Sequence, residues 1–205
     1  ICGVLVAEGL RVAVLAQPDW HDAEAFRAMG RPRLGVFIGA GNLDSMVAHY
    51  TAAKRRRSED FYSPGKRSGC RPDRAAIGSC TRAREAFGPD MPIILGSLEA
   101  SLRRFAHYDY WDDSVRRAIL FDAPADLLVY GMGEAATIEI AHRLKKKQSG
   151  RTMTDIPGTG YITRDPSVCK FDHITLPSIE DVRDEKRLYP ESTRTDYAEP
   201  EPRRG

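Results

Sequence analysis

The 205-residue sequence lacks any apolar run near the roughly 20 residues that a membrane-spanning helix needs. Its opening segment, ICGVLVAEGL, carries Glu8 and has neither a basic region nor an initiator methionine, which argues against both a signal peptide and a natural start. We therefore expect a cytoplasmic protein with no membrane contact, and a chain cut from a longer one.

A large excess of charge of one sign is also missing, because the sequence has 31 Lys and Arg side chains and 29 Asp and Glu side chains, a net charge of +2. No overall field points to nucleic acid or to an anionic membrane, so any charged partner has to be argued from local clusters.

Cysteine is scarce, and the four thiols lie far apart with no CxxC pair: Cys2, Cys70, Cys80 and Cys169. This spacing fits neither a zinc ribbon nor a disulfide-rich secreted module, so we expect free thiols in a reducing compartment and assign no metal site. The GxGxxG, GxxxxGK[ST], HExxH and GxSxG motifs are absent as well, and we name no catalytic residue.

Apolar runs and amphipathic segments alternate along the first three quarters of the chain. We predict buried strands at 12–16, 34–38, 92–95 and 125–130. We predict helices at 1–10, 23–29, 71–87 and 134–147, with glycine or proline near most of their ends. Strands that are apolar on both faces and alternate with helices indicate a doubly wound, mostly parallel α/β sheet over 1–148. Residues 149–205 read as a partly irregular linker, with one charged helix at 179–189.

Glycine-containing loops follow three of the predicted strands. Ligands of open α/β sheets bind beyond the carboxyl ends of the strands, so these loops form one candidate cofactor-binding edge. Turn glycines and helix caps explain the same pattern without a ligand, and both explanations stay open. The candidate residues are Gly41, Asn42, Asp44, Ser45, Gly96, Ser97, Glu99, Ser101, Gly131, Gly133 and Glu134.

The segment 54–74 holds eight Lys and Arg side chains against three acids, and aromatic residues are interleaved with them. Positive charge beside stackable rings is typical of single-strand nucleic-acid contacts. A solvated loop that pairs with acidic groups of a neighbouring domain is the alternative. The candidate nucleic-acid residues are Lys54, Arg55, Arg56, Arg57, Lys66 and Arg67.

The stretch 105–113 is rich in aromatic and acidic residues and includes His107 and Asp109. We favour a structural role over metal binding, with Asp112 and Asp113 capping a helix at 114–121. We expect Arg103 and Arg104 to pair with these acids or with Glu99.

Several long strings closely resemble the N-terminal region of the YgiQ family of radical SAM proteins. They are AQPDWHDAEAFRAMGRPRLGVFIGAGNLDSMVAHYTAAKRRRSEDFYSPG, RPDRA, EASLRRFAHYDYWDDSVRRAILFDAPADLLVYGMGE and LPSIEDVRDEK. GSLEAS and YGMGE are also similar to loops of cobalamin-binding-type domains, which have a flavodoxin-like sheet.

The resemblance implies a downstream barrel in which a CxxxCxxC motif holds a 4Fe-4S cluster that cleaves S-adenosylmethionine to a radical. No such motif occurs here, and nine residues separate Cys70 from Cys80. The DxHxxG motif, whose histidine binds cobalamin from below, is absent too, so cobalamin lacks motif support. The expected partner is the chain's own downstream radical SAM domain.

Family members also carry a first strand ahead of residue 1, which in the flavodoxin-like order 2-1-3-4-5 lies between the strands at 12–16 and 34–38. Without that strand, we expect this chain alone to be marginally stable or to aggregate. The functional hypothesis is an accessory domain of a radical SAM enzyme of unknown substrate. A nucleic-acid- or nucleotide-binding module, with RNA as substrate, and a purely structural scaffold are the alternatives.

Overall fold

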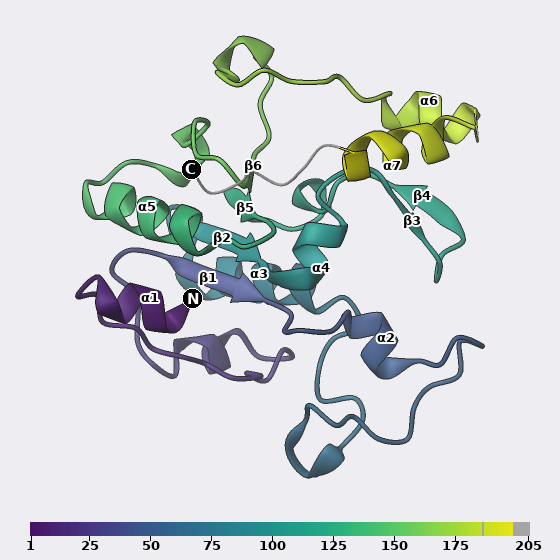
Figure 1. The fold of residues 1–205 in the computed structure, drawn as a ribbon. Coiled ribbons are helices and arrows are strands. Elements are labelled where there is room, and N and C mark those ends of the chain that lie inside the picture. The colour runs from purple at the N-terminus through teal and green to yellow at the C-terminus, as the bar shows by residue number, and fades with distance from the viewer. Residues whose placement is uncertain (186, 199–205) are drawn as a thin grey trace.

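A four-stranded sheet lies at the centre of the computed structural model, which describes residues 1–185 and 187–198 (Figure 1). Its order is β1 (Val36–Gly39), β2 (Ile93–Gly96), β5 (Leu127–Val129) and β6 (Thr159–Gly160). The first three strands are parallel and β6 runs antiparallel to β5. The predicted strands at 34–38, 92–95 and 125–130 are confirmed as β1, β2 and β5, and the α/β class with them.

Helices cover both faces of this sheet. Ile93 and Leu95 of β2 pack in one core with α3 (Ala75–Phe87), while Ile94 packs in a second core with α5 (Glu134–Lys145). All three β2 side chains are at most 1% exposed, and burying each stabilises the fold by about 1.5–3 kcal/mol. α1 (Cys2–Ala7) lies against α5 in the same layer (Figure 1).

The strand predicted at 12–16 is wrong. Residues 10–16 adopt no regular structure, and Val14 in their middle is 62% exposed. An apolar run becomes a strand only where a neighbouring strand satisfies its backbone groups, and within the described residues none pairs with this run. The short helix predicted next is a 3-10 helix, η1 (Ala23–Arg27), capped by Asp22. The inner strand that the family resemblance implies stays a prediction.

The helix predicted at 114–121 is also wrong, because an antiparallel hairpin takes its place. β3 (His107–Asp109) pairs with β4 (Ser114–Arg116), with Tyr108 opposite Val115, and η3 (Ile119–Phe121) follows. Asp113 occupies the turn with φ +50°, a conformation open to aspartate. The chain forms a hairpin with alternating side chains here, although Asp112 and Asp113 are residues suited to cap a helix. Neither of them therefore caps a helix.

The chain after α5 returns to the sheet. Following η4 (Gly150–Thr152), Met153 and Ile156 are buried in the core beside α5, and β6 extends the sheet. The division at residue 148 stays a prediction.

After η5 (Pro166–Val168), the single helix predicted at 179–189 is two helices, α6 (Ile179–Asp184) and α7 (Leu188–Ala198). The end of the predicted linker, 199–205, lies outside the described residues. No helix in the described ranges has the length and apolar character to cross a membrane.

Candidate functional site at the carboxyl edge of the sheet

The three predicted glycine loops meet at one edge of the sheet. β1, β2 and β5 all end there, and the loop after β1 leads into α2 (Ser45–His49) while α4 (Ser97–Leu102) follows β2 directly (Figure 1). Two serines of α4 bind the neighbouring loops. Ser97 Oγ accepts the Ala40 N–H at 3.1 Å, and Ser101 Oγ accepts the Gly131 N–H at 3.3 Å. The predicted edge therefore exists as a connected set of loops.

Glu99 is the centre of this edge and is only 2% exposed. Its Oε2 accepts hydrogen bonds from the Ser45 hydroxyl at 2.7 Å and the Ser45 N–H at 3.3 Å. Its Oε1 accepts the N–H of Ala76, in the first turn of α3, at 3.3 Å. One carboxyl group therefore joins the start of α2, the start of α3 and helix α4.

Asp44 is the second internal acceptor of the edge. Its carboxylate caps α2 by accepting the N–H groups of Met46 and Val47 at 3.0 and 3.4 Å, and it forms an ion pair with Arg103. An aspartate at this position satisfies backbone donors that the first helical turn leaves free. The Asp44 carboxylate therefore binds the first turn of α2 through one oxygen and Arg103 through the other.

Two backbone positions of the edge need their particular residues. A Cβ at Gly133 would lie 2.3 Å from Val129 Cγ1, so glycine allows the loop after β5 to approach the strand. Ser97 is held at φ +73°, where non-glycine residues are strained, and its hydroxyl bond to Ala40 offsets that cost. The loops are consequently fixed in shape.

Most of the predicted cofactor-binding side chains at this edge therefore already have partners inside the domain. Ser45 and Glu99, Ser97 and Ser101, and Asp44 all have partners inside the domain, as described above. Within the described residues, Asn42 makes no side-chain hydrogen bond, and Glu134 Oε2 is buried without a partner. Binding of a cofactor by this edge stays a prediction.

A histidine–aspartate–tyrosine group beside Ser45 was missed by the sequence analysis. His49 Nδ1 and the Tyr50 hydroxyl each lie 2.8 Å from a carboxylate oxygen of Asp73, and His49 is buried. Burial raises the pKa of Asp73, but the hydrogen bonds from His49 and Tyr50 outweigh it and hold the pKa below its usual range. The partners lie 23 and 24 residues apart, so no local motif signals them.

The acidic stretch 105–113 forms an ion-pair network. The Arg74 guanidinium contacts Asp109 at 2.8 Å and Asp112 at 2.7 Å, and Arg116 contacts Asp112 at 3.1 Å. Burial lowers the pKa of His107, which lines a cavity of about 10 Å³ beside this network. Such a cavity holds about one water molecule.

The pairing predicted for Arg103 and Arg104 is wrong. Arg103 pairs with Asp44, and Arg104 pairs with Asp196 of α7 at 2.5 Å. Arg104 also lies over the ring of Tyr130, 5.1 Å from its centroid, at the carboxyl end of β5. Arg104 therefore connects α7 to the edge of the sheet.

The cysteines do not fit an iron–sulfur cluster. Cys80, on the buried side of α3, is fully buried, and burial raises the pKa of its thiol to about 12, whereas a cluster ligand is a thiolate. In the described part of the chain, no three His, Cys, Asp or Glu side chains gather as metal ligands. His49 of α2 is buried against Asp73 and so is not available as a lower ligand for a corrinoid, while corrinoid binding without a histidine ligand stays a prediction.

The predicted nucleic-acid residues lie in the long loop between α2 and α3. Arg55, Arg56 and Arg57 line an open groove of about 540 Å³ together with Phe61 and Tyr62. Lys66 stands outside the groove wall, with its ammonium 5.0 Å from the centroid of the Phe61 ring. Lys54 turns away and donates to the Trp111 carbonyl in the hairpin at 3.2 Å, and Arg67 is exposed.

The whole chain, residues 1–205, matches the model of a family described as Radical SAM N-terminal. A UPF0313 protein of Clostridium botulinum strain 657 is 50% identical over 202 residues, covering 98% of this chain and 31% of the relative. A UPF0313 protein of Clostridium perfringens strain SM101 is 48% identical over 205 residues, covering 100% of this chain and 31% of the relative. The chain thus spans 31% of the length of these curated relatives. No solved structure matches it.

Proposed function

Because the chain belongs to the Radical SAM N-terminal family and is the N-terminal region of a YgiQ-type protein, we propose that it is the accessory domain of a radical SAM iron–sulfur enzyme. In the whole protein, the downstream domain supplies the 4Fe-4S cluster and S-adenosylmethionine chemistry. The residues of this chain hold neither group. They build a rigid edge against which the downstream domain is positioned.

The observation that carries this proposal is the attachment of α7 to the carboxyl edge of the sheet. The Arg104–Asp196 ion pair and the Tyr189 hydroxyl, which accepts the Tyr108 N–H at 3.0 Å, fasten α7 beside α4 and the hairpin. The last described element, α7, therefore lies at the edge where Glu99 joins the loops. The fixed loops and α7 therefore occupy the same side of the domain.

The proposal is tested on the full-length protein prepared without oxygen. We expect it to contain about four iron and four sulfide ions and, with a reductant, to release 5′-deoxyadenosine from S-adenosylmethionine. Protein that lacks iron after cluster reconstitution and releases no 5′-deoxyadenosine would contradict the enzyme assignment.

The positioning role is tested by Arg104→Glu in the same protein. We expect unchanged iron content but slower 5′-deoxyadenosine release and faster amide exchange in residues 97–102 and 188–198, because the ion pair with Asp196 becomes a repulsion. Asp196→Arg on that background should restore both. Arg33→Glu, a reversal of an exposed arginine, is the control. Unchanged exchange and release in Arg104→Glu would remove the positioning role and leave a scaffold without contact to the catalytic domain.

A further inference from the structure

The groove beside α2 combines unpaired positive charge with exposed aromatic rings. Its wall carries Arg55, Arg56 and Arg57, and its end carries Phe61 and Tyr62, which are 73% and 51% exposed. A groove of about 540 Å³ lies within the range of about 300–1,000 Å³ typical of ligand sites. The loop that forms it extends below α2, away from the sheet (Figure 1).

The arginines of the groove differ from the other arginines of the same loop. Arg71 forms a buried bidentate pair with Asp60, and Arg74 pairs with Asp109 and Asp112. In the part of the chain that the structure describes, Arg55, Arg56 and Arg57 form no ion pair with a carboxylate. Arg56 lies near enough to Asp73 to lower its pKa but leaves its guanidinium exposed. Glu59 and Asp60 also line the groove, but Asp60 is paired with Arg71, so three arginines stand against one carboxylate and this excess of positive charge favours an anion.

The frame behind the groove is rigid, although the arginines are exposed. The guanidinium of Arg71 contacts Asp60 at 2.7–2.9 Å, Ser63 donates to Asp60 at 2.8 Å, and Asp60 is 2% exposed. Arg57 Nε donates to the carbonyls of Val47 and Tyr50 at 3.2 and 3.1 Å, which fixes this side chain at the groove wall. A fixed frame lowers the entropy cost of binding.

The exposed rings of Phe61 and Tyr62 indicate which class of anionic ligand fits the groove. Acidic protein surfaces offer carboxylates but few flat partners for Phe61 and Tyr62, whereas single-stranded nucleic acid offers phosphates and bases at alternating positions. Arginine forks match phosphate oxygens in pairs, and aromatic side chains stack on bases of any sequence. We propose that the groove formed by Arg55, Arg56, Arg57, Phe61 and Tyr62 binds single-stranded nucleic acid.

The proposal is tested by fluorescence anisotropy of the full-length protein with a labelled single-stranded RNA of mixed sequence. Three phosphate contacts predict a slope of log K against log salt of about −2, so the affinity should fall roughly 20-fold between 50 and 200 mM salt. Arg55→Glu should weaken binding roughly 5- to 10-fold and reduce the slope by about 0.7, because one phosphate contact is lost. Phe61→Ala should weaken binding roughly 5- to 100-fold and leave the slope unchanged, because base stacking involves no counterion release.

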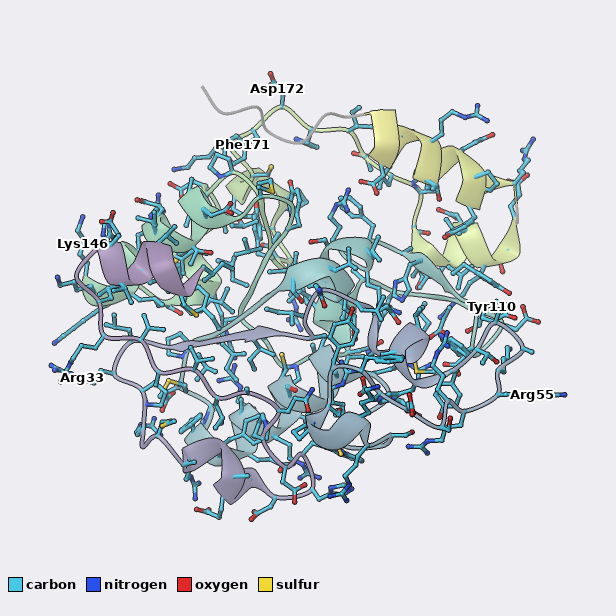
Figure 2. The ribbon with its side chains drawn as sticks, turned by 60° about the horizontal axis from the view of Figure 1, so that its bottom comes forward. Arg33, Arg55, Tyr110, Lys146, Phe171 and Asp172 are labelled. Atoms are coloured by element: carbon cyan, nitrogen blue, oxygen red, sulfur yellow. The ribbon has the colours of Figure 1, made fainter. Side chains whose placement is uncertain are left out.

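Matched controls lie elsewhere on the surface. Arg33 and Arg55 both project from the molecule at opposite ends of Figure 2, so Arg33→Glu makes the same charge change away from the groove. Phe171, which is 45% exposed and labelled in the same view, is the control for Phe61. Neither Arg33→Glu nor Phe171→Ala should change the affinity by more than about 2-fold, whereas a general charge effect would lower it equally in Arg33→Glu.

Three results would overturn the proposal. One is the absence of RNA binding at 50 mM salt, and another is equal weakening by Arg33→Glu and Arg55→Glu. The third is binding of heparin and RNA with the same affinity and no effect of Phe61→Ala, which would identify a site for polyanions without base recognition. Circular dichroism of each variant verifies that a loss of binding is not a loss of fold.

Discussion

The carboxyl edge of the sheet and the groove beside α2 lie next to each other. Their polar groups differ, because those of the edge are buried and have partners inside the domain, whereas those of the groove are exposed. At the edge, Glu99 is 2% exposed and accepts three hydrogen bonds from inside the domain. In the groove, Arg55 is exposed and forms no ion pair with any described residue. Charged side chains thus form part of a rigid frame at the edge, whereas in the groove they are available for a ligand.

Because of this difference, we expect the edge to contribute to stability and the groove to contribute to binding. Buried polar groups that satisfy one another are costly to remove, because their partners remain buried and unpaired. Exposed charges and rings contribute little to folding, so their cost of removal appears only when a partner is present. Substitutions at the edge should therefore change the free energy of unfolding, and substitutions in the groove should change affinity alone.

The largest expected effect is that of Glu99→Ala. Removing this carboxyl group leaves the buried N–H groups of Ser45 and Ala76 without their acceptor, while the Ser45 hydroxyl keeps the Asp73 carbonyl, so we expect a loss of about 2–4 kcal/mol in the free energy of unfolding. Urea unfolding of the full-length protein, followed by circular dichroism, measures it. Asp172→Ala, which removes an exposed carboxylate (Figure 2), should cost less than about 0.5 kcal/mol. Equal costs at the two positions would remove the distinction between edge and surface.

The next effect concerns the anchor behind the groove, the buried ion pair of Asp60 with Arg71. Burial raises the pKa of Asp60, but hydrogen bonds from Ser63, Arg71 and the Tyr62 N–H outweigh it and lower the pKa from its usual 3.8. A lowered folded-state pKa contributes stability that is complete above pH about 4 and is lost as the pH falls through the folded value. We expect Asp60→Asn to lose about 2–3 kcal/mol at pH 7 and to show a weaker loss between pH 4 and pH 2 than the wild type.

Urea titrations at pH 7, 4 and 3 measure this difference. Asp165 provides the control, because the pKa of this exposed carboxylate is also lowered, by hydrogen bonds from Ser167, but it has no buried cation beside it. Asp165→Asn should leave the free energy of unfolding at pH 7 nearly unchanged. A pH profile of Asp60→Asn parallel to that of the wild type would show that the anchor does not titrate with folding.

A smaller effect is expected at Gly133. Alanine at this position places its Cβ 2.3 Å from Val129 Cγ1, and the valine side chain has to turn away, at a cost of about 1–2 kcal/mol. Val129→Ala on the same background removes the clashing methyl group. The double variant should therefore be less destabilised than the sum of the two single variants. Strict additivity would mean that the loop, and not the valine, accommodates the change.

The sequence predicted the parts of the fold that depend on local pattern. Ile93, Ile94 and Leu95 are apolar without interruption, and this pattern is typical of a strand buried on both faces. The run around Val14 has the same pattern but no neighbouring strand among the described residues, and periodicity carries no information about neighbours. The prediction at 114–121 failed because Asp112 is equally suited to a helix cap and to a turn.

The sequence predicted where the candidate site lies, but not which partners its side chains have. Parallel strands end at one edge, so the loops containing Ser45, Ser97 and Glu99 were expected to lie together, and they do. That Glu99 binds Ser45 and Ala76 depends on contacts 54 and 23 residues apart in the chain, which no motif encodes. The basic character of the segment 54–74 was evident from its eight Lys and Arg side chains against three acids, but which of them stay without a partner depends on contacts outside the segment, such as that of Arg74 with Asp109.

The smallest expected effect is that of Phe61→Ala on stability. It tests whether this ring of the groove contributes to folding. Phe61 is 73% exposed, so its removal should change the free energy of unfolding by less than about 0.5 kcal/mol. Phe87, the last residue of α3 and 5% exposed in the core, is the matched position, and Phe87→Ala should cost about 3–5 kcal/mol. Urea unfolding of both variants without RNA measures the two values. A loss above 1 kcal/mol in Phe61→Ala would mean that its ring supports the loop, because an aromatic ring kept exposed for a ligand contributes little to the fold that presents it.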